Sequence, residues 1–264
     1  MTGKKNHTAL IPSEDIVKEA GKRVSAKAAR KGEPLLHMTE DMRRLSTPWS
    51  ISMIRAEQIE SFDLPAGVIL DAAVGSGAQL IALANELKRP ALGIELDGNI
   101  AVLCAANMHS ASNGEEMQKT LDRVIIGDSS DAEGAITTYW NSLMKSGIRA
   151  HPPIAMLHLD PARPRDAQNH HVDEMEPSLK DVLKSWNEYL QTGPRGPAVL
   201  LDLSHFYLAV HIIHRRVDTY VPSLAVRIEY CQSIQSEVSN AFHENRFFQL
   251  SSDERLGQIP LLSL

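Results

Sequence analysis

V-I-L-D-A-A-V-G-S-G, at residues 68–77, decides the fold of this 264-residue chain. Its first half is an apolar run that reaches Asp71, and its second half holds Gly75 and Gly77. A short, continuously apolar run is typical of a parallel strand covered by helices on both faces. Glycine lets the following backbone turn tightly and lets a ligand approach it closely. The stretch therefore predicts a buried strand that passes through a glycine turn into a helix over 77–88.

Further apolar runs follow, separated by segments with a helical pattern. The runs are 91–97, 123–128, 154–160 and 198–204, and the helical segments are 98–110, 131–145 and 178–191. This alternation predicts a parallel sheet of βαβ units. Two later segments, 225–233 and 246–252, alternate more and favour two further strands, at least one of them antiparallel. We expect an α/β, Rossmann-like, doubly wound fold with a mostly parallel seven-stranded sheet and helices on both faces.

The N-terminal part differs in composition from the rest. Its first 44 residues carry 10 Lys and Arg against 6 Asp and Glu, whereas the whole chain has a net charge of −6. Helical patterns run from Ser13 to about Lys31 and over 48–62. We expect a basic, partly helical arm over 1–45 and the main domain over 46–264. Such an arm can contact nucleic acid, and a solvated tail is an equal alternative.

The composition argues against several other classes of protein: membrane proteins, secreted proteins and metal-binding proteins. No stretch approaches the roughly 20 apolar residues that span a bilayer, and the N-terminus lacks the apolar region of a secretory signal. Cys104 and Cys231 form no CxxC pair, which argues against a disulfide framework and a zinc site and suits the cytoplasm. The histidine pairs at 170–171, in a polar loop, and at 211–214, without a matched acid, predict no metal site.

Acidic residues lie at the ends of four of the five apolar runs. They are Asp71, Glu95 with Asp97, Asp128 and Asp160. Any one of them could merely cap the following helix. Ligands of open α/β sheets bind outside the carboxyl ends of the strands, so the four together indicate one ligand crevice.

The spacing between Glu95 and the glycine turn admits two ligands. Glu95 follows Gly77 by 18 residues, at the place where an acid accepts hydrogen bonds from ribose hydroxyls. Both a nicotinamide dinucleotide and S-adenosylmethionine (SAM) carry such a ribose. A dinucleotide site usually has a third glycine, in G-x-G-x-x-G, where this chain has Leu80. SAM has no pyrophosphate to seat, so Leu80 favours SAM.

The runs LDAAVGSGAQ, GIELD, IIGDSSD and HLDPARP resemble the successive motifs of class I SAM-dependent methyltransferases, over about residues 46–252. The DPAR element at 160–163 resembles a subgroup of THUMP-like methyltransferases linked to RNA. In that subgroup a second arginine follows, whereas Pro164 stands here. The resemblance implies methyl transfer from SAM to RNA, on a tRNA or rRNA base. The alternatives are a small-molecule or protein methyltransferase on the same core and a catalytically inactive SAM-fold binding protein.

The resemblance also implies roles for individual residues. The residues that would hold SAM are Asp71, Ala73, Gly75, Gly77, Glu95, Asp128 and Ser129. Asp71 would orient the methionine end through water or backbone, and Glu95 would bind the ribose hydroxyls. Asp128, together with the N–H of Ser129, would bind the adenine. Ala73 stands where the family often has glycine.

Catalysis would fall to Asp160, beside the transferring methyl group, with Arg163 binding an anionic part of the substrate. Amino-methylating families place an aromatic residue at the fourth position of the comparable tetrapeptide, where its ring stacks on a flipped base. The element here is DPAR, so the standard base-amino mechanism is not expected. His158, two residues before Asp160, is expected to pack inside the protein rather than to act as a base.

Overall fold

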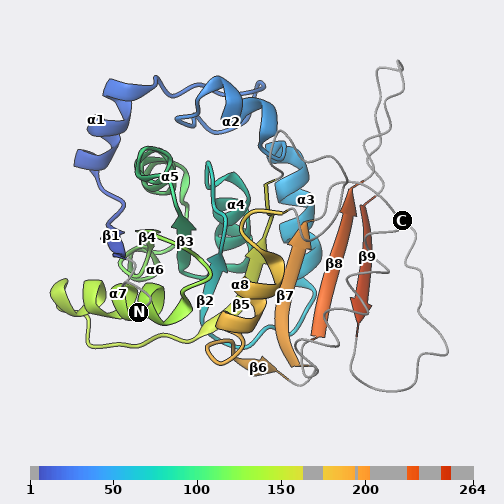
Figure 1. Cartoon of the computed structure of the whole chain (residues 1–264). Helices are drawn as coiled ribbons and strands as arrows, with labels where there is room; N and C mark the ends of the chain where they lie inside the picture. Colours follow the sequence, from blue (N-terminus) through green and yellow to red (C-terminus); the bar gives the residue numbers. More distant parts are fainter. Residues whose placement is uncertain (1–5, 163–174, 194–195, 203–224, 232–244, 251–264) are drawn as a thin grey trace, which may run out of the picture.

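A single mixed sheet with helices on both faces organises the described part of the chain. The computed structural model describes residues 6–162, 175–193, 196–202, 225–231 and 245–250 (Figure 1). The α/β class expected from the alternating apolar runs is confirmed.

Within the described ranges, nine strands form the sheet, in the order β1-β4-β3-β2-β5-β7-β8-β9, with β6 paired to β7. The six neighbouring strands from β4 to β8 run parallel, and β1, β6 and β9 pair antiparallel to their neighbours. The strands are β1 (Thr8–Leu10), β2 (Val68–Asp71), β3 (Ala91–Glu95), β4 (Arg123–Ile126), β5 (Ile154–Leu159), β6 (Thr192–Gly193), β7 (Gly196–Asp202), β8 (Ala225–Cys231) and β9 (Asn245–Leu250).

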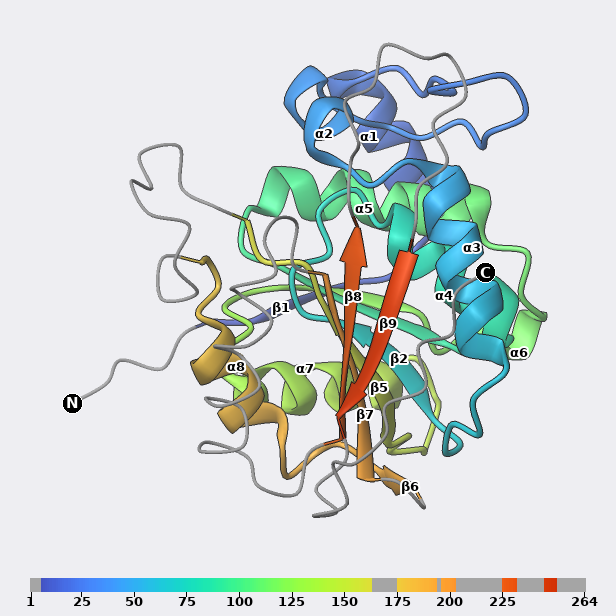
Figure 2. The same ribbon diagram turned by 90° about the vertical axis from the view of Figure 1, so that its right-hand side faces the viewer.

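Helices cover the sheet in two layers (Figure 2). The helices are α1 (Glu14–Arg23), α2 (Glu40–Leu45), α3 (Trp49–Glu60), α4 (Ala78–Leu87), α5 (Gly98–Ala111), α6 (Glu116–Lys119), α7 (Ala132–Lys145) and α8 (Leu179–Trp186). Val68 and Leu70 of β2 pack with α7 and α8, whereas Ile69 packs with α3, α4 and α5. The strand is apolar from Val68 to Leu70 because successive side chains enter different cores.

The described part of the predicted arm, residues 6–45, packs against the rest of the described chain. Its strand β1 forms the edge of the sheet and pairs with β4, and α1 lies along α5. Arg23 Nη1 donates to Asn99 Oδ1 at 2.9 Å near the start of α5. At the other end of that helix, His109 Nε2 lies 3.2 Å from Glu14 Oε1. These two contacts place α1 antiparallel to α5.

The prediction of seven strands is wrong in number. Strands β1 and β6 have three and two residues, which is too short to give a period-two pattern in the sequence. The first helix is also shorter than predicted: it ends at Arg23 because Val24 adopts an extended backbone. No helix in the described ranges has both the length and the apolar character of a membrane span.

Asp122 has a buried carboxyl group that links the starts of the neighbouring strands β3 and β4. Its Oδ1 accepts a hydrogen bond from the backbone N–H of Ala91 at 2.8 Å. Burial raises the pKa of Asp122 from 3.8 to about 7, against the opposing effects of the Ala91 N–H and of Arg123. The folded state therefore binds this proton more tightly than the unfolded state does. Between about pH 4 and pH 7, the contribution of Asp122 to the free energy of unfolding falls as pH rises.

We expect Asp122→Asn to stabilise the protein at pH 8 and to change its stability little at pH 4. Asparagine keeps an oxygen for Ala91 N and carries no charge to bury. One pKa unit corresponds to about 1.4 kcal/mol, so a pKa raised from 3.8 to about 7 corresponds to a gain of at most about 4 kcal/mol at pH 8. Urea unfolding of both proteins at the two pH values measures it. A difference in stability that is the same at both pH values would contradict the prediction.

Candidate functional site at the carboxyl edge of the sheet

The strand-end acids come together at one edge of the sheet, as predicted. Strands β4, β3, β2 and β5 are consecutive neighbours and all parallel, so their carboxyl ends lie at the same edge. Asp71 and Glu95 are the last residues of β2 and β3. Asp160 directly follows β5, and Asp128 follows β4 by two residues. The edge therefore carries four carboxylates in a row.

The two glycines in the turn between β2 and α4 have different structural roles. Gly75 and Gly77 have φ values of +52° and +80°, in the region that favours glycine. A Cβ on Gly77 would lie 2.9 Å from Cys104 Sγ, so this glycine allows α4 to pack closely on α5. A Cβ on Gly75 would meet nothing within 4 Å. Gly75 thus leaves open space at the turn, where a ligand could reach the backbone.

Glu95 is bonded to this turn. Its Oε2 accepts a hydrogen bond from Gly75 N at 3.1 Å, and its Oε1 accepts one from Asp97 N at 2.9 Å. Burial raises the pKa of Glu95, while the two N–H groups oppose that shift. Each carboxylate oxygen can accept a further hydrogen bond. Glu95 is therefore positioned beside the open space at Gly75 with remaining acceptor capacity.

Asp71 is almost completely buried, with 2% of its surface exposed, and its carboxylate accepts hydrogen bonds from other groups of the protein. His158 Nδ1, from the neighbouring strand β5, donates to Asp71 Oδ2 at 2.8 Å. The backbone N–H of Ala73 donates to Asp71 Oδ1 at 3.1 Å. Asp71 thereby holds the first half of the glycine turn against β5. His158 is 1% exposed, in agreement with the expected packed histidine.

Asp128 and Ser129 form the turn after β4. Asp128 Oδ1 accepts hydrogen bonds from Ser130 N at 2.8 Å and from Ser130 Oγ at 2.6 Å. Ser129 is buried, and its carbonyl accepts a hydrogen bond from Trp186 Nε1 of α8 at 2.8 Å. The hydrogen bond from α8 thus fixes this turn. The two residues expected to bind adenine lie next to the end of β3, because β4 pairs with β3.

Asp160 stands at the start of the loop that follows β5. It is partly exposed, and Pro161 after it is buried. The backbone N–H of Glu176 donates to Ala162 O at 2.9 Å, so the two stems of this loop meet close to Asp160. Arg163 and the histidine pairs at 170–171 and 211–214 lie outside the described residues.

Two structural contacts of the site were not predicted. One is the Asp71–His158 pair, which follows from the register that places these residues side by side. The other is Asn107 of α5, which is fully buried and donates from Nδ2 to the carbonyls of Ser76 and His37 at 2.9 and 3.0 Å. The single amide within the apolar run 100–108 of this helix is the signal that could have revealed it.

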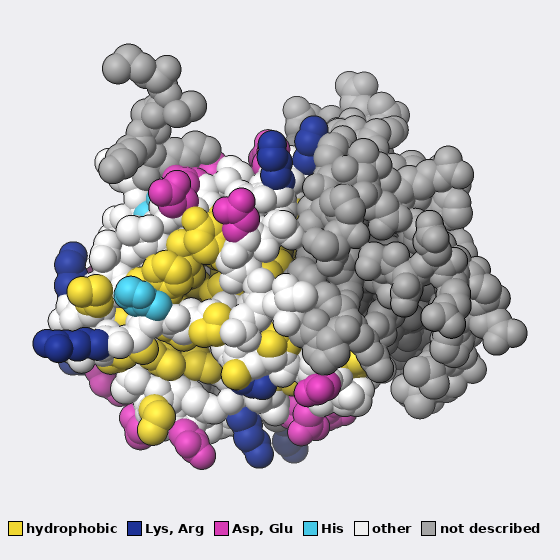
Figure 3. Space-filling view, turned by 90° about the horizontal axis from the view of Figure 1, so that it is seen from below, with side chains coloured by type: hydrophobic (Ala, Val, Ile, Leu, Met, Phe, Trp, Pro, Cys, Tyr) yellow, Lys and Arg dark blue, Asp and Glu magenta, His cyan; other side chains and the backbone are white. Residues whose placement is uncertain are grey.

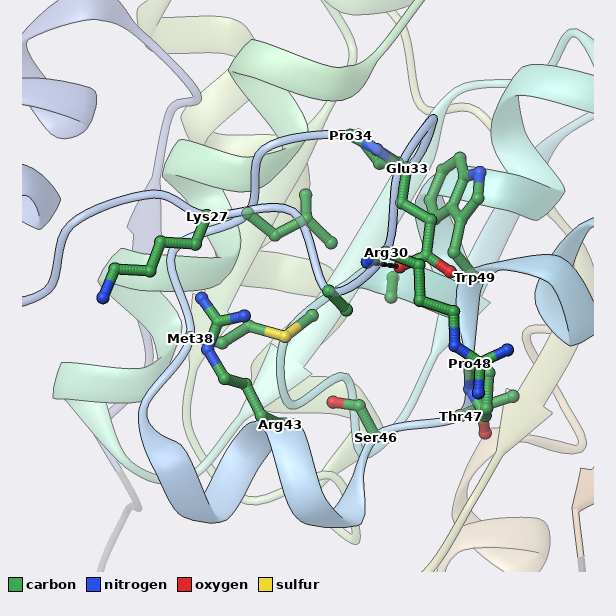
Figure 4. Close-up of a pocket in the computed structure, with 13 residues that line it drawn as sticks. Lys27, Arg30, Glu33, Pro34, Met38, Arg43, Ser46, Thr47, Pro48 and Trp49 are labelled. Atoms are coloured by element: carbon green, nitrogen blue, oxygen red, sulfur yellow. Dashed lines mark hydrogen bonds between the residues drawn. The ribbon is translucent and has the colours of Figure 1, made fainter.

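Asn107 ties the arm to the glycine turn, and a second contact reinforces the link. The Ser46 and Ser76 hydroxyls lie 3.1 Å apart. Beside this link is a pocket of about 250 Å³, lined almost entirely by residues 27–49 of the chain and by Ala78 at the start of α4 (Figure 4). The arm therefore builds a second concave surface next to the strand-end acids.

Comparison with known proteins adds little to this geometry. No family model matches the sequence, and no curated protein matches it. Among solved structures, the chain is similar to a proposed methyltransferase from Porphyromonas gingivalis W83, at 16% sequence identity and a TM-score of 0.42. The match covers 81% of this chain, which spans about half (50%) of that protein. A likeness of this degree says nothing about activity, so the geometry of the site carries the functional proposal.

Proposed function

We propose that this protein is a SAM-dependent methyltransferase. The observation that carries the proposal is the Glu95 carboxylate, which is hydrogen-bonded to Gly75 N beside the open turn between β2 and α4. An acid at the end of the second strand, next to a glycine turn at the end of the first, is an arrangement that binds the ribose of a nucleotide cofactor.

The residues at this edge suit SAM. Glu95 would accept the ribose hydroxyls, and the space at Gly75 admits a ligand to the backbone. Asp128 and Ser129 would contact the adenine. Asp71 would act on the methionine end through the Ala73 backbone that it holds, together with Gly77 at the start of α4. When bound, SAM supplies an electrophilic methyl group.

Leu80 distinguishes SAM from a dinucleotide. A dinucleotide turn would have its third glycine at this position, where it permits close packing of helix and strand. Leu80 is fully buried in the first turn of α4 and packs in the core formed with α5. The turn therefore lacks the full dinucleotide pattern, which favours a cofactor without a pyrophosphate.

On the substrate side, Asp160 would accept a hydrogen bond from the attacking group and orient it. Pro161 stiffens the backbone that carries this carboxylate. Arg163 would bind an anionic part of the substrate. We propose RNA as that substrate, on the basis of the DPAR resemblance and the basic arm. A small molecule or a protein as substrate, and a binding protein without catalysis, are the competing hypotheses.

Calorimetry with SAM, its demethylated product and NAD tests the cofactor. We expect SAM and the product to bind in the low-micromolar range, about −8 kcal/mol. Glu95→Ala should weaken both by roughly 1.5–3 kcal/mol, the value of a hydrogen bond to a charged group. Glu57→Ala, at an exposed position on α3, is the matched control and should leave both affinities unchanged. Tight binding of NAD without binding of SAM would refute the proposal.

Transfer of a labelled methyl group tests the substrate. The protein is incubated with labelled SAM and with total RNA, protein or small-molecule extracts, in parallel with Asp160→Ala. Label that enters RNA only with the wild-type protein supports the RNA hypothesis. Label that enters another pool in the same way identifies the competing substrate.

A further inference from the structure

The pocket lined by residues of the 27–49 segment and by Ala78, called the arm pocket below, is not used by the proposed cofactor site. The backbone bridge between Lys27 and Leu36 shapes its rim, and Ser46 to Trp49 form its opposite wall (Figure 4). None of the strand-end acids Asp71, Glu95, Asp128 and Asp160 lines it. It is thus a compartment of its own beside the glycine turn.

Cationic side chains line this pocket. Lys27, Arg30 and Arg43 contribute to its wall, against a single acid, Glu33. The Glu33 carboxylate already accepts a hydrogen bond from the Arg30 backbone N–H at 2.8 Å. Such an excess of positive charge in a concave site attracts an anionic ligand.

Arg43 has a guanidinium nitrogen that lacks a hydrogen-bond partner in the described part of the chain. Its Nη2 is buried from solvent and has no hydrogen-bond partner among the described residues. In Figure 4 its guanidinium rises from α2 to lie beside Met38. The next residue, Arg44, is exposed and lies 3.6 Å from Asp41 in an ordinary surface ion pair. A buried donor without a partner is costly, so the Arg43 guanidinium would gain by turning toward an anion in the pocket.

Two helix N-termini add to the positive potential. Helices α3 and α4 begin at the pocket, at Trp49 and Ala78. Neither has a hydrogen bond from an N-cap side chain or an acidic residue in its first turn. A single long bond, 3.4 Å from Ala78 N to Ser76 Oγ, partly compensates α4.

The other described helices are capped by side chains. Their capping residues are Ser13, Thr39, Asp97, Glu115, Asp131 and Ser178. The uncapped N–H groups of α3 and α4 therefore lie at the pocket that the three cations line, and helix N-termini of this kind bind phosphate.

We propose that the arm pocket binds a backbone phosphate of single-stranded RNA, with a neighbouring base on the Trp49 indole. Cations together with an aromatic side chain are the usual elements of single-strand binding. The opposite end of the molecule, seen from below in Figure 3, carries basic and acidic side chains intermingled around an apolar strip in its described part. The inference rests on the proposed RNA substrate. The Ser46–Ser76 contact joins the pocket wall to the glycine turn, so the bound strand would lie next to that turn.

The test measures binding of a labelled single-stranded oligouridine at several salt concentrations. We expect Arg43→Gln and Arg30→Gln each to lower the affinity about tenfold. Each should also reduce the slope of log affinity against log salt by about 0.7, the value for one phosphate contact on a single strand. Trp49→Leu should lower the affinity without a change of slope.

Arg44→Gln is the matched control, because it removes the same charge one residue away and outside the pocket. SAM affinity, measured on every variant, should stay at the wild-type value and shows that the variants are folded. Equal losses for Arg43→Gln and Arg44→Gln would overturn the pocket while leaving RNA as substrate. Loss of SAM binding in place of RNA binding would assign the pocket to the cofactor. A wild-type protein that binds SAM but no RNA would overturn both RNA proposals and leave the methyltransferase proposal intact.

Discussion

Asp160→Ala is expected to lower the single-turnover rate of methyl transfer by about 10²–10⁴-fold, the usual range for a group that handles a proton or orients a nucleophile. Methyl transfer is an in-line displacement, so the protein must hold an electron-rich atom about 3 Å from the methyl carbon. Asp160 follows β5 directly, beside the end of β2, and is accessible to a substrate. The same substitution should leave SAM affinity nearly unchanged, because the proposed cofactor residues lie on the other strand ends.

Rapid-quench kinetics at saturating SAM, with the substrate identified by labelled transfer, measures this effect. Asp63→Ala provides the control, since Asp63 is exposed and lies before β2, at the far edge of the sheet. A near-normal rate in Asp160→Ala would show that the D-P-A-R element is structural. The catalytic contact would then have to come from elsewhere in the loop after β5.

Asp71→Ala is expected to lower the free energy of unfolding by about 3–5 kcal/mol, because it removes two buried hydrogen bonds to a carboxylate, each worth roughly 1.5–3 kcal/mol. The substitution removes the 2.8 Å bond from His158 Nδ1 and the 3.1 Å bond from Ala73 N, both in a site that water does not reach. His158 would be left buried without its carboxylate. The glycine turn would also lose its attachment to β5, so SAM binding should weaken at the same time.

A double-mutant cycle with His158→Leu separates the two effects. The double variant should recover part of the lost stability, because the buried histidine that lost its carboxylate is replaced by an apolar side chain, but should not recover SAM binding. Asp71→Asn keeps an oxygen for Ala73 N and should cost less than Asp71→Ala. Denaturant unfolding and calorimetry on the same samples give both quantities. A cost below about 1 kcal/mol for Asp71→Ala would show that the pair contributes little.

The central strands and the acidic residues at their ends could be predicted from the sequence. Each of the five long apolar runs forms a strand, because a strand covered on both faces needs apolar residues at every position. Parallel strands bring their carboxyl ends to one edge, so Asp71, Glu95, Asp128 and Asp160 were expected together. Their hydrogen-bond partners could not be read in this way, since strand order decides which side chains become neighbours.

What the sequence by itself determined is the alternation of strands and helices, the glycine turn at Gly75 and Gly77 and the row of acids, since all three depend on local residue patterns. The tertiary structure alone decided that His158 meets Asp71 and that Asn107 fastens the arm to the turn. It also decided that the arm folds back and forms a cationic pocket with α3 and α4. These contacts join residues far apart along the chain, and no local pattern specifies such pairs before the sheet and its helices have packed.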